Sequence, residues 1–198
     1  MKIIYNCFLS ILNNSLLQMS TPFLCGDKDL DDFFHNDVDN YAKQLLGKTY
    51  CFQSKKEKKS IIGAFTLSNA SIDARHIPNS RKKKLTKNIP YEKSMSSYPA
   101  TLIGRLGVNK EYAGQGIGTE LLEFIKQWVL AADTKSGCRY LIVDSYNRED
   151  VLYFYESNGF KTLFFSEQQE KEYIGLTDNK SLKTRLMYFD LIVTQSAK

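Results

Sequence analysis

Disulfide and metal-binding patterns are scarce in this sequence. Its four cysteines, Cys7, Cys25, Cys51 and Cys138, include no Cys-x-x-Cys pair, and there are only two histidines. A disulfide framework, a zinc site and a histidine metal cluster are therefore not expected. Unpaired, reduced thiols are typical of a cytoplasmic protein.

Long apolar runs are also lacking. An apolar stretch follows Lys2, but residues 5–6 and 13–14 interrupt it, and no small-residue cleavage site comes after it. No window approaches the ~20 apolar residues that cross a bilayer. We expect a soluble cytoplasmic protein with no membrane partner, and a first strand near Ile3 to Leu12.

Charge gives only a weak indication of a partner. The chain has 27 basic and 22 acidic residues, a formal net charge of +5 over 198 residues. Two local basic runs stand out, the lysines at 55, 56, 58 and 59 and the run Arg81–Lys84. Each run is typical either of a solvated surface or of a contact to RNA. The length and the 42% hydrophobic content fit a single domain, residues 1–198.

A strand, a glycine turn and a helix follow one another between Leu102 and Leu122. An apolar run ends near Val108, glycines recur at 114, 116 and 118, and an amphipathic helix begins near Ile117. Such a turn brings several backbone N–H groups to one point beside the positive end of the helix dipole. The sequence therefore predicts a binding site for a diphosphate.

Two common glycine loops fit this segment poorly. A P-loop requires Gly-Lys and then Ser or Thr, whereas Gly118 is followed by Thr119 and Glu120. A Rossmann turn requires a third glycine where Thr119 stands. Another class of diphosphate ligand is favoured.

The order of elements predicts a mixed α/β sheet. We expect a helix between Asp27 and Gly47, a helix from Ile117 that ends at Gly137, and a short helix from Asp150 to Gly159. Expected strands cover 48–52, 60–68, 102–108, 139–145, 161–165 and 183–192. The segment 70–99 is the least regular part, and the polar segment 166–180 connects the last two strands. This order favours a mixed twisted sheet with helices on both faces.

The run Ala113–Gly118 resembles the pyrophosphate loop of the GNAT acetyltransferases, and Phe154–Phe160 resembles a second motif of that family at the usual separation. Ala113 departs from the family's usual Arg or Gln. The resemblance extends over nearly the whole chain and implies the GNAT fold and transfer of an acetyl group from acetyl-CoA to a primary amine by direct attack.

The resemblance also implies roles for particular residues. Leu106, Gly107 and Val108 would hold the pantetheine arm, and Asn147 would bond to it or serve only in a turn. Tyr155 would protonate the leaving thiolate or would simply pack. The pyrophosphate would lie against Ala113, Gly114, Gln115, Gly116, Ile117, Gly118 and Thr119.

The acceptor amine stays open at this stage. No general base is defined by spacing, which suits an α-amine with a pKa of about 7.7 to 8.0. The segments around Cys25–Gly26 and Phe33–Phe34 resemble the tRNA-acetylating toxins of toxin–antitoxin pairs, which implies aminoacyl-tRNA as substrate and an antitoxin partner. The alternatives are a general small-molecule or protein amine acetyltransferase and a non-catalytic acyl-CoA-binding module, and a homodimer is common in the family.

Overall fold

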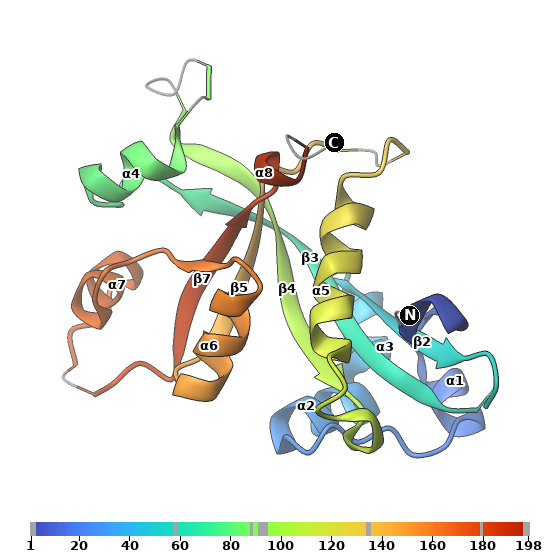
Figure 1. Ribbon diagram of the computed structural model, residues 1–198. Helices are drawn as coiled ribbons and strands as arrows, with labels where there is room; N and C mark the ends of the chain where they lie inside the picture. The colour runs from blue at the N-terminus through green and yellow to red at the C-terminus, as the bar shows by residue number, and fades with distance from the viewer. Residues whose placement is uncertain are drawn as a thin grey trace. The chain divides into compact units, whose positions relative to one another are not determined.

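The computed structural model describes residues 3–57, 59–87, 89–90, 95–133, 136–178 and 180–195. Its strands are hydrogen-bonded in the order β1-β2-β3-β4-β5-β7-β6, a seven-stranded sheet (Figure 1). Parallel and antiparallel pairs both occur, so the predicted mixed α/β class is confirmed. Lys58 of the first basic run lies outside the described residues.

The chain divides into two compact units. The first unit comprises Met1–Asn69 and Ile103–Trp128, and the second comprises Ala70–Leu102 and Val129–Lys198. The expectation of a single domain over residues 1–198 stays a prediction.

The first unit is built on an antiparallel ladder followed by the glycine turn. β1 (Cys7–Ile11) pairs with β2 (Lys48–Ser54), which pairs with β3 (Ile61–Asp73). After β4 (Ser97–Val108) come the 3₁₀ turn η4 (Lys110–Tyr112) and α5 (Ile117–Val129). The remaining elements are η1 (Ile3–Asn6), α1 (Asn14–Met19), α2 (Lys28–Asp32), the π-helical turn η2 (Phe33–Asp37) and α3 (Val38–Lys43).

Helices cover both faces of the strands in this unit, because neighbouring strand residues point to opposite sides. Cys51 packs with the buried Phe34 and Val38 of the helical segment 28–43. Phe52 faces the other way and meets Phe124 of α5 edge-on at 4.9 Å. The two-faced arrangement predicted from sequence is confirmed here, and the predicted helix from 27 to 47 is three shorter segments.

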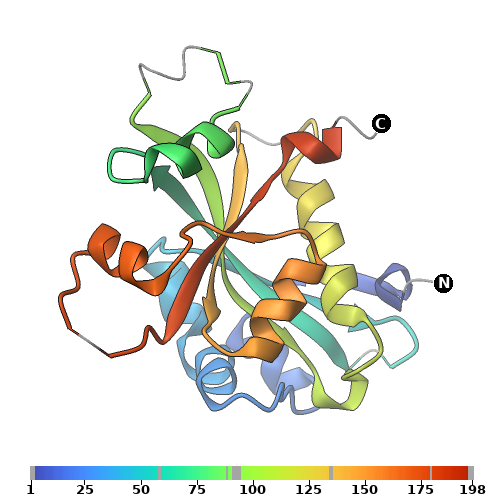
Figure 2. The same cartoon turned by 60° about the vertical axis from the view of Figure 1, so that its left-hand side comes forward.

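The second unit contains the other strands. The end of β3 and the start of β4 belong to it, and Ala100 to Leu102 pair in parallel with Tyr140 to Ile142 of β5 (Tyr140–Tyr146). β7 (Thr184–Asp190), the red strand of Figure 2, is antiparallel to β5 and to the short β6 (Lys161–Thr162) by its hydrogen-bond register. Its helices are α4 (Asn79–Leu85), α6 (Glu149–Ser157), α7 (Glu167–Ile174) and α8 (Ile192–Gln195).

Both faces of these strands are covered as well. Tyr188 lies in a buried cluster with Leu85 of α4 and Phe164, whereas its neighbour Phe189 contacts Phe160, which in turn contacts Tyr155 of α6. Adjacent residues of β7 therefore pack on opposite faces of the sheet.

Four sequence expectations need correction. The segment 70–99 is more regular than predicted, because it holds the end of β3, α4 and the start of β4. The segment 166–180 contains α7, which is capped by the Ser166 hydroxyl and by Gly175 at φ +74°. α5 ends at Val129 rather than Gly137, and β6 covers only Lys161–Thr162.

Over the described part of the chain, no helix combines the length and the apolar character that a bilayer crossing requires.

Candidate acetyl-CoA and catalytic residues

The glycine turn of the first unit adopts backbone conformations that favour glycine. Gly114 and Gly116 have φ of +74° and +78°, and a Cβ built on either would lie in open space. Space therefore does not select glycine here, whereas the left-handed backbone does. Residues 113–116 are exposed, so a ligand can reach the turn.

Immediately after this turn, α5 presents its amino-terminal amides. Its first side chain, Ile117, is 1% exposed and anchors the turn in the core, while Thr119 is exposed. Glu120 N donates to Gly116 O at 3.1 Å, and the N–H groups before it have no acceptor within the helix. An anion near Gly116 to Thr119 would meet these N–H groups and the positive end of the dipole.

Asn109 anchors the entry to the turn, a role the sequence analysis missed. Its side chain is 2% exposed, and its Nδ2 donates to Ile61 O at 3.0 Å. Its Oδ1 accepts from Glu111 N at 3.1 Å and so caps η4. An asparagine that ends a strand before a charged turn was the available signal.

Leu106, Gly107 and Val108 form the end of β4, and Gly107 is tightly surrounded. A Cβ at Gly107 would lie 2.9 Å from Phe34 Cε2 and 3.3 Å from Cys25 Cβ. Glycine is therefore required for the segment containing Cys25 and Phe34 to lie against this strand. The strand end predicted to hold pantetheine is thus packed from one side by the amino-terminal segment.

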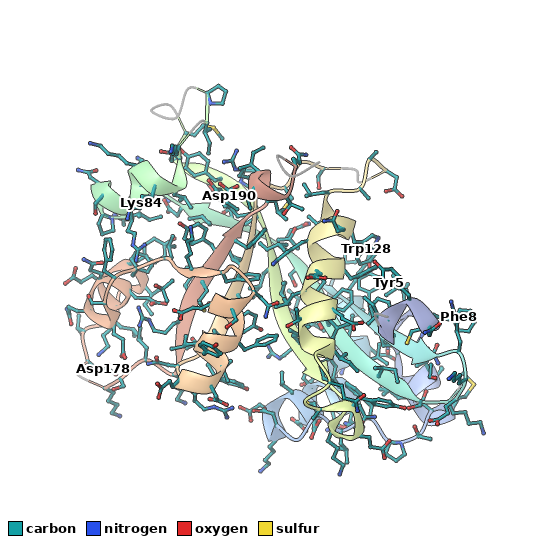
Figure 3. All side chains as sticks on the ribbon, viewed as in Figure 1. Tyr5, Phe8, Lys84, Trp128, Asp178 and Asp190 are labelled. Carbon is teal, nitrogen blue, oxygen red and sulfur yellow. The ribbon has the colours of Figure 1, made fainter. Side chains whose placement is uncertain are left out.

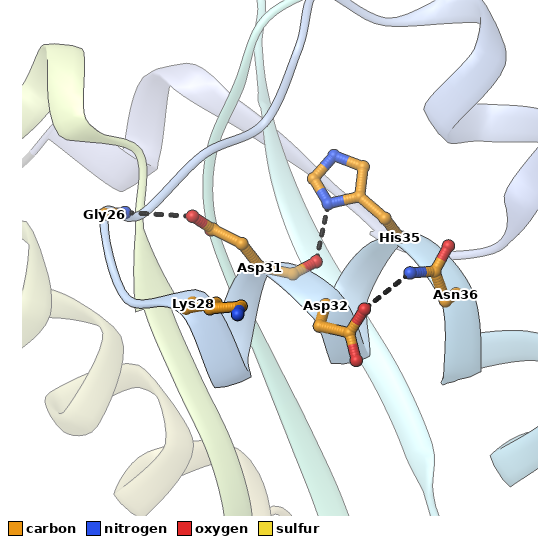
Figure 4. Close-up of a pocket in the computed structure, with 6 residues that line it drawn as sticks. All are labelled: Gly26, Lys28, Asp31, Asp32, His35 and Asn36. Atoms are coloured by element: carbon orange, nitrogen blue, oxygen red, sulfur yellow. Dashed lines mark hydrogen bonds between the residues drawn. The ribbon is translucent and has the colours of Figure 1, made fainter.

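A polar cluster beside this contact was also missed by sequence reasoning (Figure 4). Asp31 accepts hydrogen bonds from Cys25 N at 2.7 Å, Cys25 Sγ at 3.0 Å and Gly26 N at 3.3 Å. Burial opposes ionisation of Asp31, but these hydrogen bonds outweigh it and lower the pKa of the carboxyl. His35 Nδ1 lies 2.6 Å from Asp31 O. A shallow hollow of about 500 Å³ is lined by Gly26, Lys28, Asp31, Asp32, His35 and Asn36.

Tyr155 lies on α6 in the second unit. Its side chain is 9% exposed, and its ring meets Phe154 and Phe160 edge-on at 5.1 and 5.4 Å. Burial raises the pKa of the phenol, so the O–H is protonated at neutral pH. The phenol oxygen makes no hydrogen bond to any of the described residues. It is not fully buried, so it keeps some access to solvent.

Asn147 follows β5 in the second unit and makes hydrogen bonds to residues much later in the sequence. Its Nδ2 donates to Glu167 Oε1 and to Leu182 O, both at 2.9 Å. Both amide hydrogens are therefore used, and Oδ1 is the atom left to accept a further hydrogen bond.

The structure places the predicted residues in two groups. Residues 106–108 and 113–119 belong to the first unit, and Asn147 and Tyr155 to the second. Among the described residues there is no group of three His, Cys, Asp or Glu side chains suited to a metal ion.

Comparison with protein families gives a match to this part of the chain. Residues 86–162 match the acetyltransferase (GNAT) domain. This segment of the chain is therefore similar to a GNAT acetyltransferase domain. The matched stretch of the GNAT domain includes the end of β4, the glycine turn, Asn147 and Tyr155. The match supports an acetyl-CoA-dependent N-acetyltransferase.

Individual relatives add detail. The chain is 27% identical over 135 residues to a tRNA-acetylating toxin of Mycobacterium tuberculosis (strain ATCC 25618 / H37Rv), covering 68% of this chain and 74% of that protein. The crystal structure of a tyrosine-to-phenylalanine variant of KacT has a TM-score of 0.70 at 22% identity, covering 98% of this chain and 99% of that one. AtaT complexed with acetyl-methionyl-tRNAfMet gives 0.68 at 20% identity, covering 96% and 98%. The two structural likenesses establish the GNAT fold over the whole chain.

Proposed function

We propose that this acetyltransferase moves the acetyl group of acetyl-CoA to the α-amine of aminoacyl-tRNA in the cytoplasm. The observation that carries the proposal is the exposed glycine turn before α5, with Gly114 and Gly116 in the left-handed region, within a chain of toxin-like fold. The general amine acetyltransferase is the alternative that the experiment below separates from it.

Acetyl-CoA fits the residues of the first unit. The diphosphate would accept hydrogen bonds from N–H groups at residues 113–119, and backbone groups of Leu106, Gly107 and Val108 would hold the pantetheine arm. Since backbone groups make these contacts, Ala113 in place of a longer polar residue weakens no contact of this kind. AtaT, a relative of the same fold, has been solved with acetyl-CoA bound. Acetyl-CoA supplies the acetyl group as an activated thioester.

Tyr155 is the proposed proton donor. Its O–H is held in the protonated form by burial and has no acceptor among the described residues, so it is available to the sulfur of the leaving group. A thiol titrates near ~8.5, so a phenol with a raised pKa acts chiefly by donating a hydrogen bond as negative charge develops on sulfur. Asn147 Oδ1 is the proposed acceptor for a pantetheine N–H.

Charged tRNA is favoured as the acceptor by the relatives. The mycobacterial relative is a tRNA-acetylating toxin, and AtaT has been solved with acetyl-methionyl-tRNAfMet. A free α-amine is also partly neutral at cellular pH, with a pKa of about 7.7 to 8.0, so it needs less help from a general base than lysine does.

An antitoxin is the proposed protein partner. A variant of the toxin AtaT has been solved bound to the C-terminus of the antitoxin AtaR, and KacTA has been solved in a complex with DNA. Growth arrest on expression of this chain, relieved by a cognate antitoxin, would support the pairing. Arrest that persists with every candidate partner would contradict it. A homodimer stays a prediction.

The decisive experiment is transfer of labelled acetyl from acetyl-CoA to bulk aminoacylated tRNA. Deacylated tRNA, polyamines and peptides are tested in parallel. Label on charged tRNA alone supports the proposal, and label only on small amines or peptides replaces it with the general enzyme.

Two matched variants of α6 test the proton donor. Tyr155→Phe should lower kcat by about 10²-fold or more, with little change in the KM for acetyl-CoA or in stability, because the lost O–H has no partner among the described residues. Tyr153→Phe is the control, since Tyr153 is 71% exposed on the same helix. Full activity of Tyr155→Phe would remove this role.

A further inference from the structure

A hollow in the second unit gathers basic side chains from separate parts of the chain. Its volume is about 380 Å³. Lys84 at the end of α4, Lys87 just after α4, Arg139 before β5 and Lys161 at the start of β6 all line it. Asp190 at the end of β7 is the one carboxylate among its lining residues, and Figure 3 shows Lys84 and Asp190 on their two elements. The ionisable lining therefore carries a net charge of +3.

Asp190 is already fully engaged. It makes a two-pronged ion pair with Arg139, at 2.7 Å to Nε and 2.8 Å to Nη2, and it also accepts from Ile192 N at 3.1 Å. By contrast, Lys84, Lys87 and Lys161 make no ion pair within the residues that the structure describes. The three ammonium groups are exposed and therefore available to an external anion.

The walls of the hollow are held firmly. Tyr140 Oη donates to Leu85 O, which fixes the end of α4 next to Lys84. Gly159 has φ +83°, and a Cβ there would lie 3.1 Å from Phe189 Cε2, so the end of α6 lies close against β7 just before Lys161. Because these walls are already ordered, less conformational entropy is lost when a ligand binds.

The basic run Arg81–Lys84 is thereby divided into different roles. The Arg81 guanidinium stacks on the Phe165 ring at 3.6 Å, so this residue packs α4 against the segment after β6. The Lys84 ammonium lies farther from the same ring, at 5.9 Å, and also lines the hollow, where the chain adds Lys87 and Lys161. No run in the sequence shows this grouping, because Lys161 is 77 positions from Lys84.

We infer that this hollow binds backbone phosphates of RNA through Lys84, Lys87 and Lys161. The inference rests on the proposed function and deepens it, since it gives the tRNA a binding surface on the second unit. Lysine binds phosphate as a point charge, whereas planar carboxylates are best matched by the arginine fork, and Arg139 is occupied by Asp190. The site therefore suits phosphodiesters better than an acidic protein segment.

Salt-dependent binding of deacylated tRNA provides the test. The plot of log affinity against log salt should flatten by about 2 to 3 in Lys84→Gln/Lys87→Gln/Lys161→Gln, and binding near 0.1 M salt should weaken about tenfold or more. Poly-L-glutamate is titrated in parallel. An unchanged tRNA slope, or a loss confined to poly-L-glutamate, overturns the inference.

Matched variants separate this site from net charge. Lys43→Gln/Lys48→Gln/Lys56→Gln removes the same charge from exposed positions of the first unit, and Lys82→Gln/Lys83→Gln removes charge from α4 outside the hollow. Equal flattening in the first control would overturn the site. If the wild type binds tRNA through these lysines but labels only small amines, the proposed function fails while the site stands.

Discussion

The carboxylate of Asp31 accepts hydrogen bonds from both the backbone N–H and the thiol of Cys25, at 2.7 and 3.0 Å. Cys25 in turn lies against Gly107, and its Cβ is 3.3 Å from the position that a Cβ on Gly107 would occupy. Asp31 thus holds the side chain that packs on the strand end proposed to bind pantetheine.

Replacing Asp31 tests this relationship. Asp31→Ala removes the acceptor for three donors, so we expect a loss of about 1 to 3 kcal/mol in the free energy of unfolding and a raised KM for acetyl-CoA. Urea unfolding and steady-state kinetics measure the two effects. Asp32→Ala is the control on the same helix, because the Asp32 carboxylate accepts a hydrogen bond only from the exposed Asn36 side chain within the described part of the chain. Equal behaviour of the two variants would contradict the role of Asp31.

Two glycines of β4 provide a second comparison. Gly107→Ala would place a Cβ 2.9 Å from Phe34 Cε2, and Phe34 is fully buried, so we expect about 1 to 3 kcal/mol of destabilisation and weaker acetyl-CoA binding. Gly104→Ala meets nothing within 4 Å and should change little. Thermal unfolding with and without acetyl-CoA distinguishes them. Wild-type stability of Gly107→Ala would show that Phe34 can move aside without cost.

The buried ion pair between Glu170 of α7 and Arg185 of β7 provides a third prediction. Glu170 Oε2 accepts from Arg185 Nε at 2.6 Å, and the two side chains are 5% and 11% exposed. Glu170→Gln leaves the arginine charge without its counter-ion, so we expect a loss of about 3 to 5 kcal/mol in the free energy of unfolding. Glu172→Gln, exposed on the same helix, should cost less than about 0.5 kcal/mol. Urea unfolding decides, and a small effect at Glu170 would mean that water reaches the pair.

This ion pair also explains why α7 was not predicted. The residues that α7 buries include Glu170 and Lys171, so its inward face shows no apolar periodicity. α5 was predicted because its buried residues, Ile117, Leu121, Leu122 and Ile125, repeat at helical spacing. The amphipathic rule works where burial is apolar and fails where a charge pair docks the helix.

The candidate site likewise has features that could be predicted from the sequence and features that could not. The glycine turn could be predicted because its left-handed residues require glycine, which leaves a local mark in the sequence. The bonds of Asn147 to Glu167 and Leu182 left none, because those partners lie 20 and 35 residues away. The packing of Cys25 on Gly107 is likewise a contact of the folded chain alone.

The buried thiols make stability depend on pH. Burial raises the pKa of Cys51 to about 12, and burial together with the Asp31 hydrogen bond raises that of Cys25 to about 12. An unfolded thiol titrates near ~8.5, so above that pH the unfolded chain loses protons that the folded chain keeps. The stabilisation is complete below ~8.5 and declines as the pH rises toward 12, by up to about 1.4 kcal/mol per pH unit for each thiol.

Cys51→Ala should therefore flatten the fall in unfolding free energy between pH 8.5 and 10. Cys51 is fully buried and, unlike Cys25, does not donate a hydrogen bond to Asp31, so this substitution removes one titrating thiol and leaves the Cys25 cluster in place. Urea unfolding at half-unit pH steps under reducing conditions measures the slope, and the constant loss from the missing sulfur is subtracted at pH 7. Parallel curves for the variant and the wild type would mean that the Cys51 thiolate is tolerated in the core.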